Sequence, residues 1–300
     1  MSSSGDSPST AEWLKWARER LAGAGVNSPA LDAELLLAHA LRRDRSWVLA
    51  HPEHIMTPSE QALAEQLVSR RQRREPLAYI LGCQPFFGLD LLVTPAVLIP
   101  RPETEELVER AIQWLNQRAA GRRETLASLR VIDVGTGSGA IALALAHAVP
   151  ELHVIGVDDS APALEVARTN ARRLGLERRV HFAAGDLLLP FAGPFDLILA
   201  NLPYIPSAEL PTLMPEVSQY EPRRALDGGS DGLEPLRRLL AQARTRLAPD
   251  GALMAEIGAQ QGIPALAAAG ALMPDCRARV EKDLAGHDRI LIVERKGNAP

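Results

Sequence analysis

Val131-Ile132-Asp133-Val134-Gly135-Thr136-Gly137-Ser138-Gly139-Ala140 joins a short apolar run to a glycine-rich loop and then to a helix-like segment. Such an apolar run is typical of a buried strand, and the glycines permit a tight turn and a close approach of the backbone to a ligand. The next apolar run ends in Val157-Asp158, about twenty residues further on. A carboxylate at this place can accept hydrogen bonds from both hydroxyls of a ribose. The pattern predicts a strand-loop-helix unit that binds an adenosine-containing cofactor.

Similar apolar runs alternate with helix-like segments through the rest of this part of the chain. The runs cover residues 131–134, 154–157, 180–183, 197–200 and 252–257. Apolar strands separated by helices are typical of a parallel sheet that is covered on both faces. Near the end, residues 277–283 and 289–294 flank Gly286-His287-Asp288, which is a hairpin pattern. We therefore expect an α/β fold with a doubly wound, mostly parallel seven-stranded sheet and an antiparallel C-terminal strand.

The first part of the chain has helical patterns instead. Ser9 with Glu12 and Thr57 with Glu60 have the capping-box spacing that begins a helix, and Ser28-Pro29 places a proline at a first helical position. The third of these helices ends in a basic run made of Arg70, Arg71, Arg73 and Arg74. Cations suit the last turn of a helix, so this run is interpreted as a solvated helix end or as a contact for an acidic partner or an RNA phosphate.

A change in the spacing of apolar residues separates the helical first part of the chain from the part with alternating strands and helices. Residues 86–93 around Gly88 predict a short β-hairpin, and residues 103–117 return to helical spacing. We predict a small helical domain over residues 1–84, a β-hairpin linker over residues 85–100 and the sheet-containing domain over residues 101–300.

Composition excludes several classes of protein. The 300 residues are 46% hydrophobic and have a formal net charge of -4, so the chain can bury a large core and has no overall attraction for nucleic acid. Cys83 and Cys276 are too few for a disulfide framework or a four-cysteine zinc site. Residues 1–9 lack the pattern of a signal peptide, and no apolar run is long enough to span a membrane. We expect a cytoplasmic protein that binds neither membranes nor, stably, nucleic acid.

Two more aspartates point to the same cofactor site. Asp133 precedes the glycine loop, and Asp186 with Leu187 follows the third apolar run. A negative charge at Asp133 suits the ammonium and sulfonium of S-adenosylmethionine better than the pyrophosphate of a dinucleotide, and Asp186 can accept the adenine amino group. The spelling Gly135-x-Gly137-x-x-Ala140 also satisfies a dinucleotide-binding fingerprint, so the glycines alone leave an NAD enzyme open.

The tetrapeptide Asn201-Leu202-Pro203-Tyr204 directly follows the fourth apolar run. A planar –NH2 nitrogen is a poor nucleophile because its lone pair is delocalised. The side-chain oxygen of Asn201 and the carbonyl of Leu202 can each accept one of its N–H groups, which orients the lone pair and stabilises the positive charge that develops. Pro203 stiffens the loop, and the ring of Tyr204 can form an apolar wall against the planar group. The tetrapeptide predicts methylation of an amide or an exocyclic amine.

Five motifs together resemble the release-factor glutamine methyltransferase family of the HemK/PrmC type, along nearly the full length of the chain. Within them, the segment Pro100-Arg101-Pro102-Glu103-Thr104 and the stretch from Tyr220 to Gly232 are far more specific than the glycine loop. The motifs cover residues 74–82, 97–105, 133–139, 201–205 and 220–232.

The resemblance implies a Rossmann-like methyltransferase that methylates the glutamine of the Gly-Gly-Gln motif in peptide-chain release factors. It implies S-adenosyl-L-methionine as cofactor, S-adenosyl-L-homocysteine as product, and a helical N-terminal domain that helps to recognise the factor. By this analogy the glutamine is held by residues 201–204, and Arg101 and Glu103 line or brace the mouth of the site. The residues assigned to the cofactor are Asp133, Gly135, Thr136, Gly137, Ser138, Gly139, Asp158, Asp186, Leu187 and Asn201.

One position departs from the family pattern. The family usually has two prolines in the tetrapeptide, and here Leu202 replaces the first, as in ribosomal-RNA adenine dimethyltransferases. Since this position contributes its backbone carbonyl, leucine is expected to preserve the hydrogen bond. A nucleic-acid adenine methyltransferase and a ribosomal-protein glutamine methyltransferase therefore stay open as alternatives, although base flipping would require a basic groove that the scattered arginines of this part do not suggest.

Two other classes of protein fit the sequence less well. A non-catalytic cofactor-binding module would not need Asn201, Pro203 and Tyr204 together, and no catalytic His or Tyr-Lys pair supports an NAD dehydrogenase. We predict direct in-line methyl transfer by a monomer, without a metal or a covalent intermediate. No general base is required before the attack, because the methylated amide can lose its proton to solvent afterwards.

Overall fold

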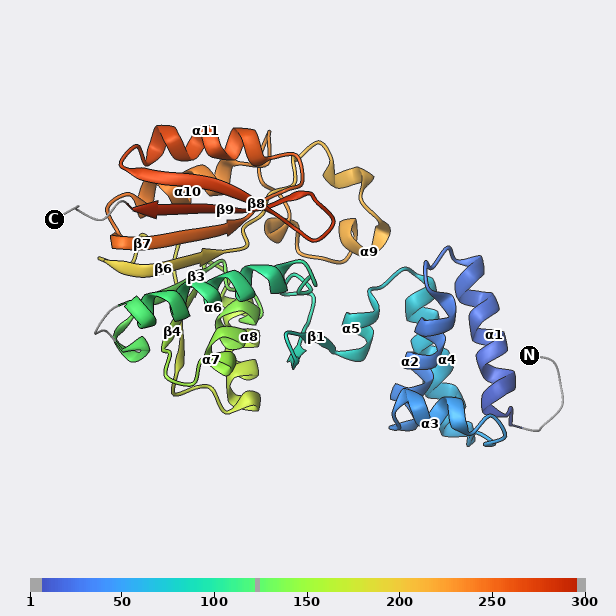
Figure 1. The fold of residues 1–300 in the computed structure, drawn as a ribbon. Coiled ribbons are helices and arrows are strands. Elements are labelled where there is room, and N and C mark those ends of the chain that lie inside the picture. Colours follow the sequence, from blue (N-terminus) through green and yellow to red (C-terminus); the bar gives the residue numbers. More distant parts are fainter. Residues whose placement is uncertain (1–6, 122–124, 296–300) are drawn as a thin grey trace. The chain divides into compact units, whose positions relative to one another are not determined.

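The glycine loop follows β3, which lies inside a seven-stranded sheet (Figure 1). In this computed structural model, which describes residues 7–121 and 125–295, the strand order is β5-β4-β3-β6-β7-β9-β8. β3 pairs in parallel with β4 and β6, whereas β9 is antiparallel to both β7 and β8. The predicted sheet, including its antiparallel C-terminal strand, is confirmed. Its strands are β3 (Val131–Val134), β4 (Val154–Asp158), β5 (Val180–Ala184), β6 (Phe195–Ala200), β7 (Leu247–Glu256), β8 (Cys276–Lys282) and β9 (Asp288–Arg295).

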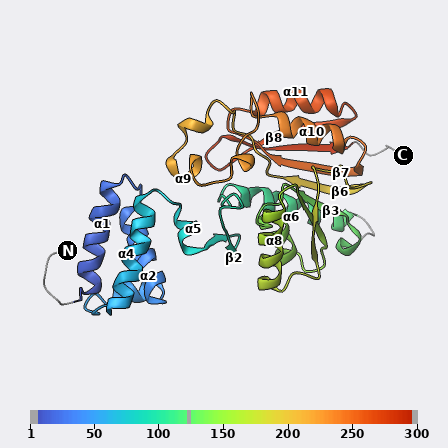
Figure 2. The same cartoon turned by 180° about the vertical axis from the view of Figure 1, so that it is seen from behind.

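Helices cover both faces of this sheet because successive residues of its strands are apolar. On β3, Val131 packs into one hydrophobic cluster and Ile132 into the other, as expected for side chains that alternate between the faces. Helices α6, α7 and α8 lie on the first face and α10 and α11 on the second (Figures 1 and 2). These helices are α6 (Thr104–Gly121), α7 (Ala140–Ala148), α8 (Ala161–Leu174), α10 (Glu234–Ala243) and α11 (Gly262–Leu272).

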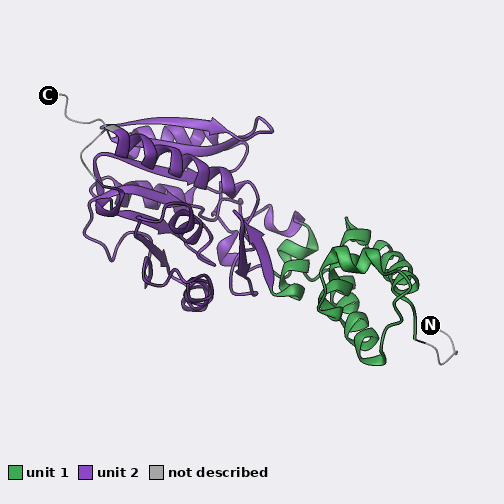
Figure 3. Ribbon diagram, turned by 60° about the horizontal axis from the view of Figure 1, so that its bottom comes forward, with its two compact units in different colours: residues 1–82, 214–220 green, residues 83–213, 221–300 purple. Residues whose placement is uncertain are grey.

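By its contacts the chain divides into two units (Figure 3). The sheet belongs to the unit formed by Cys83–Leu213 and Glu221–Pro300, and the other unit combines Met1–Gly82 with Met214–Tyr220. The sequence placed a division near residue 84 but did not anticipate that a segment from the second half joins the N-terminal unit. The predicted hairpin is present as β1 (Cys83–Phe86) paired with β2 (Leu89–Leu92).

The N-terminal unit is built from helices around its own core, in which Trp13 and Leu36 are fully buried. Both predicted capping boxes, Ser9 with Glu12 and Thr57 with Glu60, are formed. Ser28 stands at the predicted helix start, but its side chain makes no capping hydrogen bond to any described residue. The helices are α1 (Thr10–Gly23), α2 (Pro29–Leu41), α3 (Arg45–Ala50), α4 (Pro58–Gln72), α5 (Leu77–Leu81) and α9 (Pro215–Ser218).

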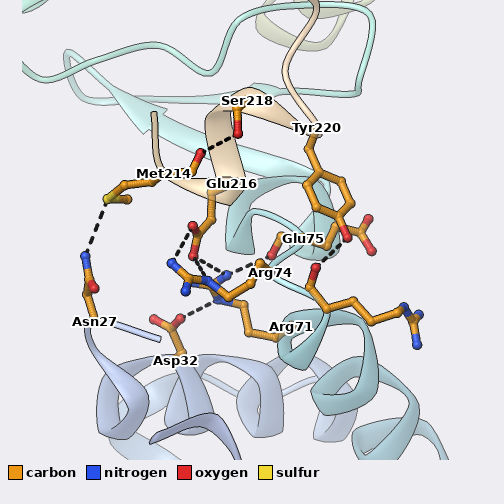
Figure 4. Close-up of polar contacts among 10 residues, drawn as sticks. Asn27, Asp32, Arg71, Arg74, Glu75, Met214, Glu216, Ser218 and Tyr220 are labelled. Carbon is orange, nitrogen blue, oxygen red and sulfur yellow. Dashed lines mark hydrogen bonds and ion pairs between the residues drawn. The ribbon is translucent and has the colours of Figure 1, made fainter. Parts of the chain in front are cut away.

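Two residues of the basic run, Arg71 and Arg74, face carboxylates of their own unit (Figure 4). Arg71 is buried and binds Asp32 at 2.7 Å and Glu216 at 2.9 Å. Arg74 donates twice to Glu216, both times at 2.7 Å. Burial alone would raise the pKa of Glu216, but the hydrogen bonds from Arg74 and Arg71 outweigh it and hold this pKa below its usual value. The acidic contact of Arg71 and Arg74 is thus inside the chain, and the interpretation of a solvated helix end is wrong for Arg71.

The connections include three short 3₁₀ helices, η1 (Leu126–Ser128), η2 (Leu210–Thr212) and η3 (Arg223–Ala225). No helix within residues 7–121 and 125–295 is long and apolar enough to cross a membrane. The expectation about a signal peptide concerns residues 1–9. Of these, residues 1–6 lie outside the residues that the structure describes.

Candidate active site

A cavity of about 300 Å³ opens where the parallel strands of the sheet end. The glycine loop after β3, the turn after β4, Asp186 after β5 and the tetrapeptide after β6 all contribute to its wall. This is the edge at which doubly wound sheets bind their ligands. Most of the residues assigned from the sequence line it: Gly135, Thr136, Gly137, Ser138, Asp158, Asp186, Leu187, Asn201, Leu202 and Pro203.

The glycine loop takes backbone conformations that other residues rarely adopt. Gly135 and Gly137 have φ values of 73° and 55°. Asp158 holds the loop from the next strand, since its carboxylate accepts the N–H of Gly137 and the N–H of Ser160, both at 2.9 Å. Burial raises the pKa of Asp158. A carboxylate held in this way keeps free lone pairs at the cavity, where ribose hydroxyls can donate to them.

Asp133 lies below the loop, and the described cavity wall does not include it. One of its oxygens accepts the Thr136 hydroxyl at 2.6 Å and the Ala142 N–H at 3.3 Å, while Oδ1 is buried without a hydrogen-bond partner among the described residues. Burial, and to a smaller extent the charge of Asp158, raises the pKa of Asp133 to about 7. This orphaned buried oxygen fits a site that receives a cation, although Asp133 itself does not line the described cavity.

Asp186 and Leu187, which the sequence assigned to the cofactor, both line the cavity. Asp186 forms an ion pair with Arg238, so the carboxylate that the sequence assigned to an adenine amino group already has a cationic neighbour. Leu187 adopts a left-handed conformation with a φ of 54°. The predicted cofactor residue Gly139 lies at the start of α7 instead of in the described wall, where an added Cβ would come within 3.1 Å of Leu143 and Phe182.

The tetrapeptide meets the glycine loop directly. Leu202 is buried, and a Cβ added to Gly135 would lie 2.9 Å from a methyl group of Leu202. Tyr204 turns away from the wall: its hydroxyl donates to Glu256 at 3.3 Å, and its carbonyl accepts from Gln261 at 2.8 Å. Burial raises the pKa of Tyr204 well above its usual value. The described cavity wall therefore does not include the apolar wall that was expected from the Tyr204 ring.

Asn201 is tied to two buried residues whose role the sequence did not indicate. Its Nδ2 donates to Thr104 Oγ1 at 3.0 Å, and this hydroxyl donates to Glu256 Oε2 at 2.7 Å. Thr104 begins α6 and Glu256 ends β7, so the contact joins segments 152 positions apart. Thr104 stood within a quoted motif and Glu256 within a predicted strand, but no spacing rule relates the two.

Comparison with known proteins decides the family. Residues 12–82 match the family model described as the PrmC N-terminal domain, and residues 126–280 match a methyltransferase domain. A release factor glutamine methyltransferase of Rhodospirillum rubrum is 44% identical over 94% of this chain and 83% of its own length. Another of Bradyrhizobium diazoefficiens is 43% identical over 94% of this chain and 95% of its own. The chain belongs to the release factor glutamine methyltransferase family.

A solved structure agrees with this fold. A methyltransferase from Pyrococcus furiosus superimposes with a TM-score of 0.51 at 21% identity, covering 77% of this chain and 99% of that one. The Rossmann-like methyltransferase architecture predicted from the resemblance is confirmed. The curated relatives, and not this fold, show that the family member is an enzyme.

Arg101 and Glu103 differ in their placement. Arg101 donates to both oxygens of Glu221 at 2.7 Å and 2.6 Å, and the Glu221 side chain is only 1% exposed. Burial raises the pKa of Glu221 even though the Arg101 charge opposes this. Arg101 therefore braces the stretch from Glu221 onward, of which Pro222 lines the cavity, and Glu103 is exposed. Within the described ranges, no group of His, Cys, Asp and Glu could hold a metal ion in this family member.

Proposed function

We propose that this protein transfers a methyl group from S-adenosyl-L-methionine to the side-chain amide nitrogen of the glutamine in the Gly-Gly-Gln motif of peptide-chain release factors. The observation that carries the proposal is the meeting of Asn201 and Leu202 with the glycine loop in one cavity. The 44% identity to a curated release factor glutamine methyltransferase supports the choice of substrate.

The cofactor is assigned to the wall formed by the glycine loop and the ends of β4 and β5. The residues that would hold it are Gly135 to Ser138, Asp158 at the ribose, and Asp186 with Leu187 at the adenine. The charge of Asp133 would act on its cationic end from beneath the loop. When bound, S-adenosylmethionine supplies an electrophilic methyl group, and no metal is needed for this chemistry.

The tetrapeptide would make the amide nitrogen reactive. Asn201 Oδ1 and the Leu202 carbonyl each accept one N–H of the substrate amide, which turns the nitrogen lone pair toward the methyl group. The same two oxygens stabilise the positive charge that develops on nitrogen. The proton is then lost to solvent, so the chain needs no general base. Since Leu202 acts through its backbone carbonyl, leucine can accept the substrate N–H as well as the proline that the family usually has at this position.

The N-terminal unit is proposed to recognise the factor, because residues 12–82 match the PrmC N-terminal domain. We propose that the protein works in the cytoplasm as a monomer, releases S-adenosyl-L-homocysteine and forms no stable complex with nucleic acid. Residues 1–84, 85–100 and 101–300 are proposed as its recognition domain, linker and catalytic domain.

The test uses the purified full chain and methyl-labelled S-adenosylmethionine with three acceptors: a release factor, the same factor with the Gly-Gly-Gln glutamine changed to alanine, and ribosomal RNA. Label on the intact factor that vanishes with the alanine change is the expected result. Label on the alanine variant or on RNA alone, or no label on the factor, would overturn the proposal. A ribosomal protein included as a fourth acceptor separates the related glutamine methyltransferase activity.

A further inference from the structure

A continuous chain of hydrogen bonds runs from the cavity into the interior of the sheet domain. It starts at Asn201, passes through the Thr104 hydroxyl and ends at Glu256, whose other oxygen accepts the Tyr204 hydroxyl. Thr104 is 3% exposed and Glu256 is 4% exposed, so water does not compete for these bonds. Thr104 and Asn201 line the cavity, which places one end of the chain at the substrate position.

The direction of these bonds follows from counting protons. A threonine hydroxyl has one proton to donate, and an ionised carboxylate can only accept. With Glu256 ionised, the Thr104 proton must point to Glu256, so the lone pairs of Thr104 Oγ1 face Asn201. Only the –NH2 group of the Asn201 amide can then turn toward Thr104, and its Oδ1 atom is left to face the cavity.

We propose that Thr104 and Glu256 are positioning residues that set the orientation of the Asn201 amide and thereby make the site specific for an amide over a carboxylate. This rests on the proposed function, because it concerns how Asn201 recognises glutamine. An Asn201 that presents Oδ1 accepts a hydrogen bond from a glutamine –NH2 group and repels a glutamate carboxylate. An Asn201 turned by half a rotation presents its own –NH2 group, which favours glutamate and leaves glutamine without its acceptor.

The surroundings of Glu256 support a tunable orientation. Burial raises the pKa of Glu256, the hydroxyls of Thr104 and Tyr204 and the charge of Arg289 oppose this, and the charge of Glu103 adds to it. If Glu256 takes up a proton, it can donate to Thr104, which is then free to donate to Asn201 Oδ1. Protonation of Oε2 therefore reverses the bonds from Glu256 to Thr104 and from Thr104 to Asn201, while Oε1 still accepts the Tyr204 hydroxyl, and turnover is expected to fall toward acidic pH.

The experiment compares full-length wild type with Thr104→Val, which keeps the shape but removes the hydroxyl, and with Thr104→Ser, which keeps the hydroxyl. Three quantities are measured: kcat on a release factor, the affinity for S-adenosylmethionine, and the ratio of affinities for the factor and for its glutamine-to-glutamate variant. For Thr104→Val we expect kcat to fall by roughly 10² and the preference for glutamine to fall about tenfold. Thr104→Ser should restore both, and the cofactor affinity should stay within a few-fold throughout.

A double-mutant cycle tests whether the two residues act as one unit. Glu256→Gln offers an amide that can donate to Thr104 and so reverses the chain without removing volume. The double variant Thr104→Val with Glu256→Gln should lose no more kcat than the worse single variant, since either change alone already removes the correct orientation of Asn201. Fully additive losses would overturn the proposal.

Two controls separate this role from a merely structural one. Thr10→Val removes another buried hydroxyl, which donates to the His54 carbonyl at 3.3 Å in the N-terminal unit, and should leave the glutamine preference unchanged. If Thr104→Val binds cofactor normally and keeps both the wild-type kcat and the wild-type preference, the positioning role is wrong while the proposed function stands. If wild type itself leaves the release factor unlabelled, the proposed function fails first and the positioning role falls with it.

Discussion

Glu216 in the N-terminal unit and Glu256 in the sheet domain are both buried carboxylates, yet their partners differ in kind. Glu216 is held by the guanidinium groups of Arg71 and Arg74, and Glu256 is held by the hydroxyls of Thr104 and Tyr204. The cationic partners lower the pKa of Glu216, whereas burial raises the pKa of Glu256. Cationic partners neutralise the charge of a carboxylate and hold it in place by ion pairs. Hydroxyl partners do not neutralise the charge, and a hydroxyl that donates to the carboxylate must accept from its next neighbour.

The two arrangements serve different ends. The cluster of Glu216 ties Met214–Tyr220 to the helices of its unit, and this segment lies in the sequence between the tetrapeptide and the stretch from Glu221 to Gly232. The chain of Glu256 ends at Asn201, beside the glycine loop. The comparison therefore predicts that changes around Glu216 act mainly on stability and that changes around Asn201 act mainly on turnover.

The largest effect is expected at the catalytic end of the Glu256 chain. Asn201→Ala removes the acceptor of the substrate amide, and kcat should fall by roughly 10² to 10³ or more, while cofactor affinity stays within a few-fold. Turnover assays and calorimetry with S-adenosylmethionine measure the two quantities. Asn116→Ala, an exposed position on α6, is the matched control. Retained turnover in Asn201→Ala would refute the role of this residue.

The next effect is expected in the N-terminal unit. Glu216→Ala leaves the buried Arg71 with one carboxylate fewer, and breaking a buried ion pair of this kind costs about 3–5 kcal/mol. Denaturant unfolding followed by circular dichroism measures this loss. The same change at the exposed Glu209 should cost much less. If both variants unfold alike, the cluster does not stabilise the unit.

A smaller effect is expected from the titration of Asp133. The pKa of this carboxyl is about 7, raised by burial and by Asp158, so Asp133 is ionised above this pH and neutral below it. The ionised form attracts the cationic cofactor, and affinity should weaken up to about tenfold from pH 8 to pH 6. Binding titrations across this range test it. Asp133→Asn should flatten the profile, and an unchanged profile in that variant would remove Asp133 as its cause.

The smallest effect is expected for a pair of charges on the surface. Arg172 and Glu165 on α8 approach to 3.2 Å with side chains 57% and 65% exposed. Arg172→Ala should change the free energy of unfolding by less than about 1 kcal/mol, because solvent screens such pairs. A loss of unfolding free energy as large as that of Glu216→Ala would show that buried and exposed ion pairs contribute equally to the stability of this protein.

Local patterns predicted the frame of the fold well. The strand at Val131–Val134 was placed without error, because an apolar run before glycines leaves few alternatives. The capping boxes at Ser9 and Thr57 formed as predicted, since their partners lie three residues away. Asp158 and Asn201 were placed at the cavity because parallel strands bring their carboxyl ends to one edge of the sheet.

Contacts between distant parts of the chain were beyond local patterns. The solvated interpretation of Arg71 rested on its place in the last turn of a helix, which suits a cation. Its burial depends on Glu216, which is 145 positions away. The Tyr204 ring was expected at the cavity. Instead, the Tyr204 hydroxyl donates to Glu256, the Tyr204 backbone carbonyl accepts from Gln261, and the ring does not line the cavity.

By itself, the sequence of this protein determined the alternation of strands and helices, the glycine loop and the family, and it predicted the chemistry of Asn201-Leu202-Pro203-Tyr204. All of these depend on residues close together along the chain, where spacing translates directly into geometry. Only the tertiary structure decided that Thr104 and Glu256 stand behind Asn201 and that Met214–Tyr220 belongs to the N-terminal unit. Buried hydrogen bonds and ion pairs form between the groups that the packed fold brings together away from water. The spacing of residues along the sequence does not predict which distant groups those are.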